Sequence, residues 1–176
     1  MEFDDLVDRY EKPIYNLILR LVGDPDEAAD LTQDAFVSAY RSYSSFRGES
    51  SVYTWLYRIA LNKCKNRIKE YDRRRGLEAG SLDDEYDATS AAGAGTHGVT
   101  ATPHVALERK ELRERIERAI AELPSDYRIV AVLRDLQGLS YEEVAQAAEL
   151  SIDVVRTRIS RAREMLRRKL SPYLEL

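Results

Sequence analysis

The sequence contains little that could support a disulfide or a metal site. Among its 176 residues Cys64 is the single cysteine, and His97 and His104 are the two histidines. One cysteine excludes an internal disulfide, and two isolated histidines provide no metal-ligand spacing. We therefore expect no metal, no other cofactor and a reducing compartment.

Long apolar runs and strand patterns are also absent. No apolar stretch approaches the length that crosses a membrane, and the N-terminus is acidic where a signal peptide would be basic. We therefore expect a cytoplasmic protein without membrane insertion. Apolar residues do not alternate with polar ones over any length but recur at intervals of three and four, which predicts an all-α fold.

The N-terminal part reads as three helices. Gly23 stops the first helix, Asp24-Pro25 combines an N-cap with proline at the first helical position, and Ser50 or Ser51 caps the third helix. Serine and glycine make residues 42–50 a loop between the second and third helices. The predicted helices cover residues 3–21, 24–41 and 52–75.

The composition changes at residue 76. Residues 76–104 are rich in Ala, Gly, Ser and Thr, lose helical periodicity and contain an acidic cluster at 83–87, which predicts a flexible linker. Helical spacing resumes near Leu112 and again at 125–136, with Gly138 as the stop. The sequence thus predicts two small helical domains, 1–75 and 105–176.

The second domain contains a helix-turn-helix pattern. Ser140-Tyr-Glu-Glu143 is a capping box that opens a short helix ending near Ala148, and Ser151 can cap a second helix of about eighteen residues. In that motif the second helix enters the major groove with its N-terminal end first. The candidate contacts to duplex DNA are Ser151, Asp153, Arg156, Thr157, Arg158, Ser160 and Arg161.

Charge and aromatic residues are unevenly distributed. Residues 1–34 hold ten acidic and three basic residues, whereas residues 41–75 hold ten basic and three acidic ones, although the whole chain has a net charge of −4. Seven of the fifteen aromatic residues lie between Phe36 and Tyr57. Aromatic faces beside a positive surface are typical of sites for single-stranded nucleic acid, and the acidic segment suggests a separate partner.

Five motifs resemble the extracytoplasmic-function sigma factors, group IV of the sigma-70 superfamily. They are Asp30-Leu-Thr-Gln-Asp-Ala-Phe36, Phe46-Arg-Gly-Glu-Ser-Ser51, Thr54-Trp-Leu-Tyr-Arg-Ile-Ala-Leu-Asn62, Gly138-Leu-Ser-Tyr-Glu-Glu-Val-Ala145 and Val155-Arg-Thr-Arg-Ile-Ser-Arg-Ala-Arg163. The resemblance implies a dissociable subunit of bacterial RNA polymerase. Its first domain would read and melt the minus-ten promoter element, and its second would read the minus-thirty-five element.

The same resemblance implies roles for individual residues. Asp30, Gln33 and Asp34 match the helix that docks on the polymerase. The residues that match minus-ten contacts to the melted strand are Phe46, Arg47, Gly48, Ser51, Trp55, Arg58, Asn62, Lys63, Lys65 and Arg67. Trp55 could support the loop or touch DNA. Two positions depart from the family: Val52 replaces a frequent aromatic residue, and Glu149 replaces a small turn residue, which predicts a turn without a left-handed residue.

The implied partners are core RNA polymerase, promoter DNA as duplex and as melted non-template strand, and an anti-sigma factor that masks both domains. We expect no enzymatic activity. Two rival functions are a stand-alone helix-turn-helix repressor and a DNA recombinase or nuclease that uses the motif for targeting. The enzyme would need a nucleophile or paired carboxylates on rigid elements, and the tight acidic cluster lies in the predicted linker.

Overall fold

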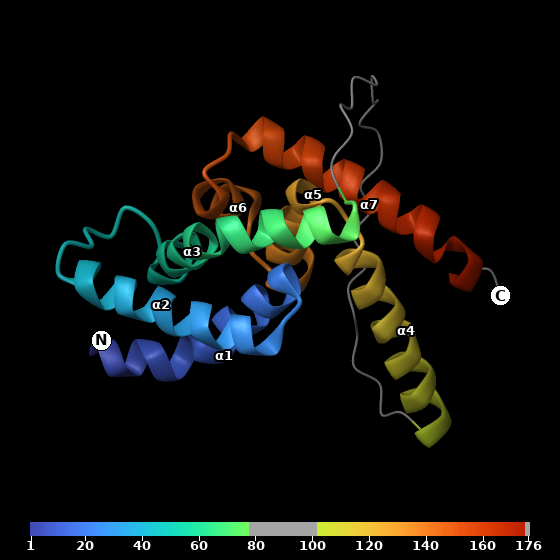
Figure 1. The fold of residues 1–176 in the computed structure, drawn as a ribbon, viewed down its shortest axis with the longest axis horizontal. Helices are drawn as coiled ribbons and strands as arrows, with labels where there is room; N and C mark the ends of the chain where they lie inside the picture. Colours follow the sequence, from blue (N-terminus) through green and yellow to red (C-terminus); the bar gives the residue numbers. More distant parts are fainter. Residues whose placement is uncertain (78–101, 175–176) are drawn as a thin grey trace.

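The computed structural model describes residues 1–77 and 102–174, and every regular element in these ranges is helical (Figure 1). Because these ranges contain no strand, the predicted all-α class is confirmed. Most of the predicted linker, including its acidic cluster, lies outside the described residues. The helices form one unit before this gap and one after it.

Three helices make up the N-terminal unit: α1 (Phe3–Val22), α2 (Pro25–Tyr43) and α3 (Val52–Arg75). Gly23 ends α1 with a left-handed φ of 75°, and a β-carbon there would lie 2.6 Å from the Tyr71 ring. The Asp24 carboxylate accepts two backbone N–H groups of the first turn of α2. Because α2 continues to Tyr43, the following loop is shorter than predicted.

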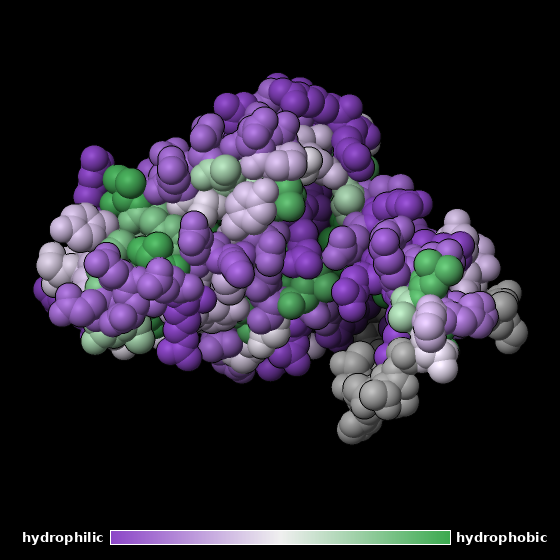
Figure 2. Space-filling view, turned by 90° about the horizontal axis from the view of Figure 1, so that it is seen from below, coloured by the Kyte–Doolittle hydropathy of each residue, from purple (hydrophilic) through white to green (hydrophobic). Residues whose placement is uncertain are grey.

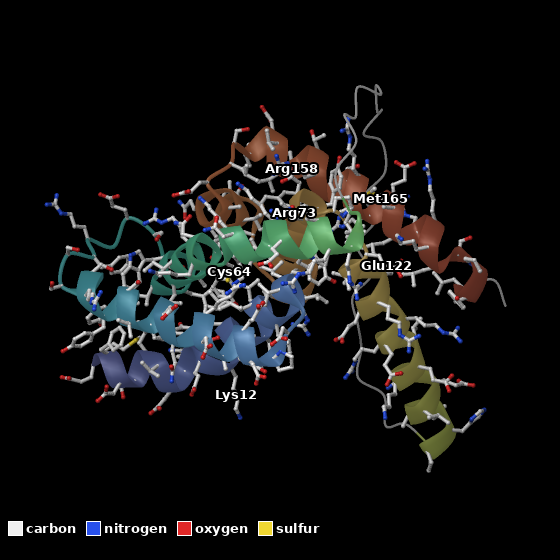
Figure 3. All side chains as sticks on the ribbon, viewed as in Figure 1. Lys12, Cys64, Arg73, Glu122, Arg158 and Met165 are labelled. Carbon is white, nitrogen blue, oxygen red and sulfur yellow. The ribbon has the colours of Figure 1, made fainter. Side chains whose placement is uncertain are left out.

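The interior of this unit is mostly apolar. Cys64 lies in it on α3 (Figure 3), and burial raises the pKa of its thiol to about 12, so the thiol is an inert packing group. Lys12, by contrast, projects from the outer side of α1. The buried positions match the predicted helical spacing and include Leu6, Ile14, Leu17, Ile18, Leu21, Ala28, Ala35, Leu56, Ala60, Leu61 and Ile68.

The C-terminal unit consists of α4 (Pro103–Ala121), α5 (Ser125–Ala131), a π-helical turn η1 (Val132–Leu136), α6 (Tyr141–Ala148) and α7 (Ile152–Leu174). Thr102 caps α4 and Pro103 starts it, so the helix begins next to the predicted end of the linker at residue 104. The predicted helix over 125–136 contains the π-helical turn, and Gly138 follows it with a left-handed φ of 76°. α7 is also longer than predicted, at 23 residues.

The two units pack against each other through α3, which contacts α5 and α6. Figure 1 shows α6 and α7 on the same side of α3, while α4 projects away from the rest of the molecule. Buried apolar residues form one cluster that includes Ile68 of α3 together with Val130, Val144 and Ile159 of the C-terminal unit. The hydrophobic core therefore continues across the junction. The face in Figure 2 is mostly hydrophilic, with a hydrophobic group at the left and smaller ones near the middle and at the right.

Candidate nucleic-acid interface

The loop between α2 and α3 forms one wall of a pocket. Gly48 has a left-handed φ of 73°, a conformation that glycine adopts without steric cost, and the Ser51 hydroxyl accepts the Thr54 N–H at 3.0 Å to begin α3. Phe46 is half-buried, whereas Arg47, Gly48 and Ser51 are exposed. The loop therefore combines a fixed aromatic ring with accessible polar groups.

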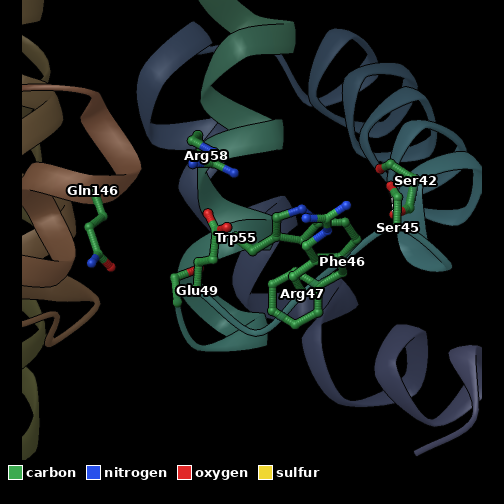
Figure 4. Close-up of a pocket in the computed structure, with 9 residues that line it drawn as sticks. Ser42, Ser45, Phe46, Arg47, Glu49, Trp55, Arg58 and Gln146 are labelled. Atoms are coloured by element: carbon green, nitrogen blue, oxygen red, sulfur yellow. Dashed lines mark hydrogen bonds between the residues drawn. The ribbon is translucent and has the colours of Figure 1, made fainter.

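The pocket itself has a volume of about 390 Å³. Its aromatic side is built by Phe46 and Trp55, whose ring centroids lie 4.9 Å apart with planes tilted by 38°. Trp55 is only 6% exposed and packs toward Tyr43, yet it still lines the pocket. The polar side chains that complete the lining come from the last turn of α2, the loop, α3 and α6 (Figure 4): Ser42, Ser45, Arg47, Glu49, Ser50, Arg58 and Gln146.

Two sides of α3 carry the basic residues that were predicted to meet DNA. Arg58, Asn62 and Lys65 are spaced by four and three residues, so they share one exposed face that leads away from the pocket. Lys63 is also exposed. Arg67 follows Arg58 by two and a half helical turns and faces the other way, where it lies 3.3 Å from Glu27 of α2. In the structure Arg58, Asn62 and Lys65 therefore lie on one side of α3, and Arg67 lies on the opposite side.

The helix-turn-helix has the predicted caps and a turn that differs from the prediction. The Ser140 hydroxyl accepts the Glu143 N–H at 3.1 Å, and the Glu143 carboxylate accepts the Ser140 N–H at 2.8 Å. Glu149 is left-handed, with φ 56°, so the expected turn without such a residue is wrong. This conformation lets Glu149 and Leu150 donate their N–H groups to the Ala145 carbonyl, which the end of α6 would otherwise leave unpaired.

The outer side of α7 presents most of the residues predicted to contact duplex DNA. Ser151 caps the helix through the Val154 N–H at 3.3 Å. Arg158 differs from its neighbours because it turns toward the bundle, where it lies 3.6 Å from Asp126 of α5 (Figure 3). Arg156 remains outward, 3.8 Å from Asp153. Of the predicted set, four residues are exposed, Ser151, Asp153, Arg156 and Thr157, and three are half-exposed, Arg158, Ser160 and Arg161.

A third group lies on α2. Asp30, Gln33 and Asp34 are exposed and spaced so that they share one side of the helix. Thr32 and Ala35, between and beside them, are buried. The acidic side is therefore held outward by the same helix that packs into the core.

Comparison with known proteins gives the family. Residues 6–74 match Sigma-70 region 2, and residues 113–166 match Sigma-70, region 4. The chain is 40% identical over 175 residues to the RNA polymerase sigma-H factor of Pseudomonas aeruginosa, which covers 98% of this chain and 88% of that protein. It is also 40% identical over 172 residues to the ECF RNA polymerase sigma-E factor of Escherichia coli, with the same coverage. The chain belongs to the extracytoplasmic-function sigma factors.

Two solved structures share the fold of this sigma factor. One is the sigma factor RpoE in complex with the anti-sigma factor NepR from Bartonella quintana, with a TM-score of 0.67, 22% identity and coverage of 99% of this chain and 98% of that one. The other is CnrH in complex with the cytosolic domain of CnrY, with a TM-score of 0.66, 24% identity and coverage of 97% and 88%. In the described part of this sigma factor, no helix has the length and apolar character needed to span a membrane.

Sequence reasoning missed several residues of this sigma factor that the fold brings together. Gln146 lines the pocket from α6, and a single glutamine in an amphipathic helix carries no signal of that role. Arg128 did leave a signal, because it interrupts a run of apolar residues on α5, yet it was not singled out. It is completely buried and paired with Asp72 of α3. Both residues belong to the junction between the two units.

Proposed function

We propose that this sigma factor directs core RNA polymerase to specific promoters and helps to melt the minus-ten element. The observation that carries the proposal is the pocket whose aromatic side is built by Phe46 and Trp55, at the start of the basic face of α3. An aromatic surface can hold an unpaired base with a stacking energy of about 1–3 kcal/mol, which favours the melted strand over the duplex. Arg58, Asn62 and Lys65 would then follow the strand away from the pocket.

The helix-turn-helix supplies the second contact. Arg156 and its outward neighbours on α7 would read the minus-thirty-five element as duplex DNA. Asp30, Gln33 and Asp34 would dock on the core polymerase, where an acidic helix face suits a basic partner. In this arrangement the chain performs no chemistry of its own, and it acts in the cytoplasm with the polymerase.

An anti-sigma factor is a further proposed partner. The two solved structures that share this fold were determined as complexes, one with an anti-sigma factor and the other with the cytosolic domain of CnrY. A comparable partner for this chain would compete with DNA for the basic faces. Copurification of the tagged chain from its native cells, followed by release on addition of core polymerase and promoter, would identify it.

A reconstituted transcription system tests the main proposal. Core polymerase and the purified chain would first select promoters from a random DNA library, and the selected fragment would then be probed with permanganate, which modifies unpaired thymines. We expect modification at the minus-ten element only when chain and polymerase are both present. Melting by the chain alone, or no change in the specificity of the polymerase, would contradict the proposal and favour a repressor or a DNA-processing enzyme.

A further inference from the structure

An apolar side chain lies on the exposed side of α7, the second helix of the helix-turn-helix. Val154, in the first turn of α7, is 37% exposed, whereas the neighbouring Val155 is completely buried. In the described part of α7 the other exposed large apolar residues, Tyr173 and Leu174, lie at the opposite end of the helix. A single exposed valine is ordinary on a protein surface, so the place of Val154 in the motif is what carries information.

The first turn of α7 is held in place by its cap. The Val154 N–H donates to the Ser151 hydroxyl at 3.3 Å, and the Val155 N–H donates to the Ser151 carbonyl at 3.1 Å. Figure 1 shows α7 along one edge of the molecule. In a helix-turn-helix the N-terminal part of the second helix contacts base edges in the major groove. Val154 therefore lies where a base edge would meet the helix.

Thr157 adds a second methyl group beside Val154. The two residues are three positions apart, so their side chains are neighbours on one side of α7. The Thr157 hydroxyl donates its hydrogen to the Asp153 carbonyl at 3.0 Å. Because this bond uses the hydroxyl hydrogen within the helix, Thr157 presents a methyl group and an acceptor to a base, but no donor.

Charged residues flank this pair of side chains on α7. Arg158 turns toward the bundle, where it lies 3.6 Å from Asp126 of α5. Arg156 is exposed and lies 3.8 Å from Asp153. The pair is therefore an uncharged patch within a basic surface. Such a patch suits a base edge better than a phosphate, which needs a hydrogen-bond donor or a positive charge.

Thymine is the base that offers an apolar group in the major groove. It presents its C5-methyl group there beside the O4 acceptor, whereas the other bases present hydrogen-bonding groups. Contact between this methyl group and apolar side chains removes apolar surface from water. We propose that Val154 and Thr157 read the C5-methyl group of a thymine in the minus-thirty-five element. The inference rests on the proposed function, since it specifies what the same helix recognises.

Deoxyuridine tests this assignment, because it pairs like thymidine and lacks only the C5-methyl group. Reconstituted holoenzyme would first select its minus-thirty-five element from a random library. Each thymine of either strand would then be replaced singly, and gel shift of the holoenzyme would measure the affinity for each duplex. We expect a position at which the wild type binds about fourfold more weakly after the replacement, as the loss of one buried methyl group requires.

Two variants remove methyl groups from the protein instead. Val154→Ala shortens the exposed valine, and Thr157→Ser removes one methyl group but keeps the hydroxyl that bonds to the Asp153 carbonyl. On the thymine duplex each variant should bind about two- to fourfold more weakly than the wild type. On the deoxyuridine duplex each should differ from the wild type by less than about twofold, because the contact is already absent there.

Leu112→Ala is the matched control. Leu112 is 38% exposed, almost the same as Val154, but it lies on α4. This variant should bind both duplexes like the wild type and show the full effect of deoxyuridine. Circular dichroism should show equal helicity for all chains. If Val154→Ala loses helicity, Thr157→Ser carries the test, because it retains the hydrogen bond within the helix.

Three results would overturn the proposal. No thymine replacement changes the affinity by more than about twofold, both variants keep the full effect of deoxyuridine, or the selected element contains no A·T pair. In each case the proposed function stands, because the wild-type holoenzyme still binds its element. If the holoenzyme selects no minus-thirty-five element at all, the assignment of α7 to duplex DNA fails, and the reading of the methyl group fails with it.

Discussion

Replacing Phe46 with alanine should remove half of the aromatic surface in the pocket while leaving the helices in place. The Phe46 and Trp55 centroids are 4.9 Å apart, and Trp55 is held by the core, so the variant retains one ring of the two. Loss of a stacked base costs about 1–3 kcal/mol, which corresponds to about 5- to 150-fold weaker binding of the melted strand. Phe46 is half-buried in a loop, and its contact with Trp55 contributes about 0.5–1.5 kcal/mol to the free energy of unfolding. This loss is small enough for the helices of the variant to stay folded.

Fluorescence anisotropy with a labelled oligonucleotide of the minus-ten non-template strand measures this loss in the reconstituted holoenzyme. Tyr173→Ala is the matched control, since Tyr173 is an exposed aromatic residue near the end of α7 that stacks on Arg115 at 4.2 Å. We expect the control to bind like the wild type. Affinity of Phe46→Ala within twofold of the wild type, with helicity retained, would refute the assignment of the pocket to a flipped base.

Three other predictions address the remaining surfaces. Arg156→Ala should weaken binding of the minus-thirty-five duplex by about 1–3 kcal/mol, measured by gel shift of the holoenzyme, with core-polymerase binding unchanged; equal loss of both would indicate misfolding instead. Combined Asp30→Lys and Asp34→Lys should abolish holoenzyme assembly in a pull-down with core polymerase, and normal assembly would refute the docking role. Burial is the main cause that raises the pKa of Tyr57 above its ordinary 10.0, so the folded state favours the neutral phenol. Below pH 10 the Tyr57 phenol is neutral in both the folded and the unfolded state, so its contribution to the free energy of unfolding is fully present. Above pH 10 the unfolded state loses the proton first, and this contribution falls as the pH rises. In denaturant unfolding between pH 8 and 11, the free energy of unfolding should therefore decline less steeply in Tyr57→Phe than in the wild type.

Local chemistry made much of the fold predictable. The Asp24-Pro25 start of α2, the Ser140 capping box and the glycine after α1 act within a few residues, so each can be read directly from the chain. The left-handed Glu149 was not predicted, because the carbonyls at the end of α6 decide that conformation rather than the side chain. The loop from Phe46 to Ser51 was predicted to contain contacts to the melted strand, but the pocket beside it also has walls from α2, α3 and α6, which only the fold brings together.

The basic residues of α3 also separate into those that the sequence placed correctly and one that it did not. Spacing alone places Arg58, Asn62 and Lys65 together, yet Arg67 was grouped with them by resemblance to the family. In the structure Arg67 instead lies 3.3 Å from Glu27 of α2. Helical spacing puts Arg67 on the side of α3 opposite Arg58, and the tertiary structure adds which residue of α2 it meets there.

The sequence by itself determined the helices, the two units and the helix-turn-helix, because caps and apolar spacing act over one or two turns. The tertiary structure alone decided how the units meet. Arg128 and Asp72 are 56 positions apart, and Tyr57 and Gln137 are 80 apart. Whether such residues are solvated or buried as partners depends on the packing of distant surfaces, and local preferences carry no record of that packing.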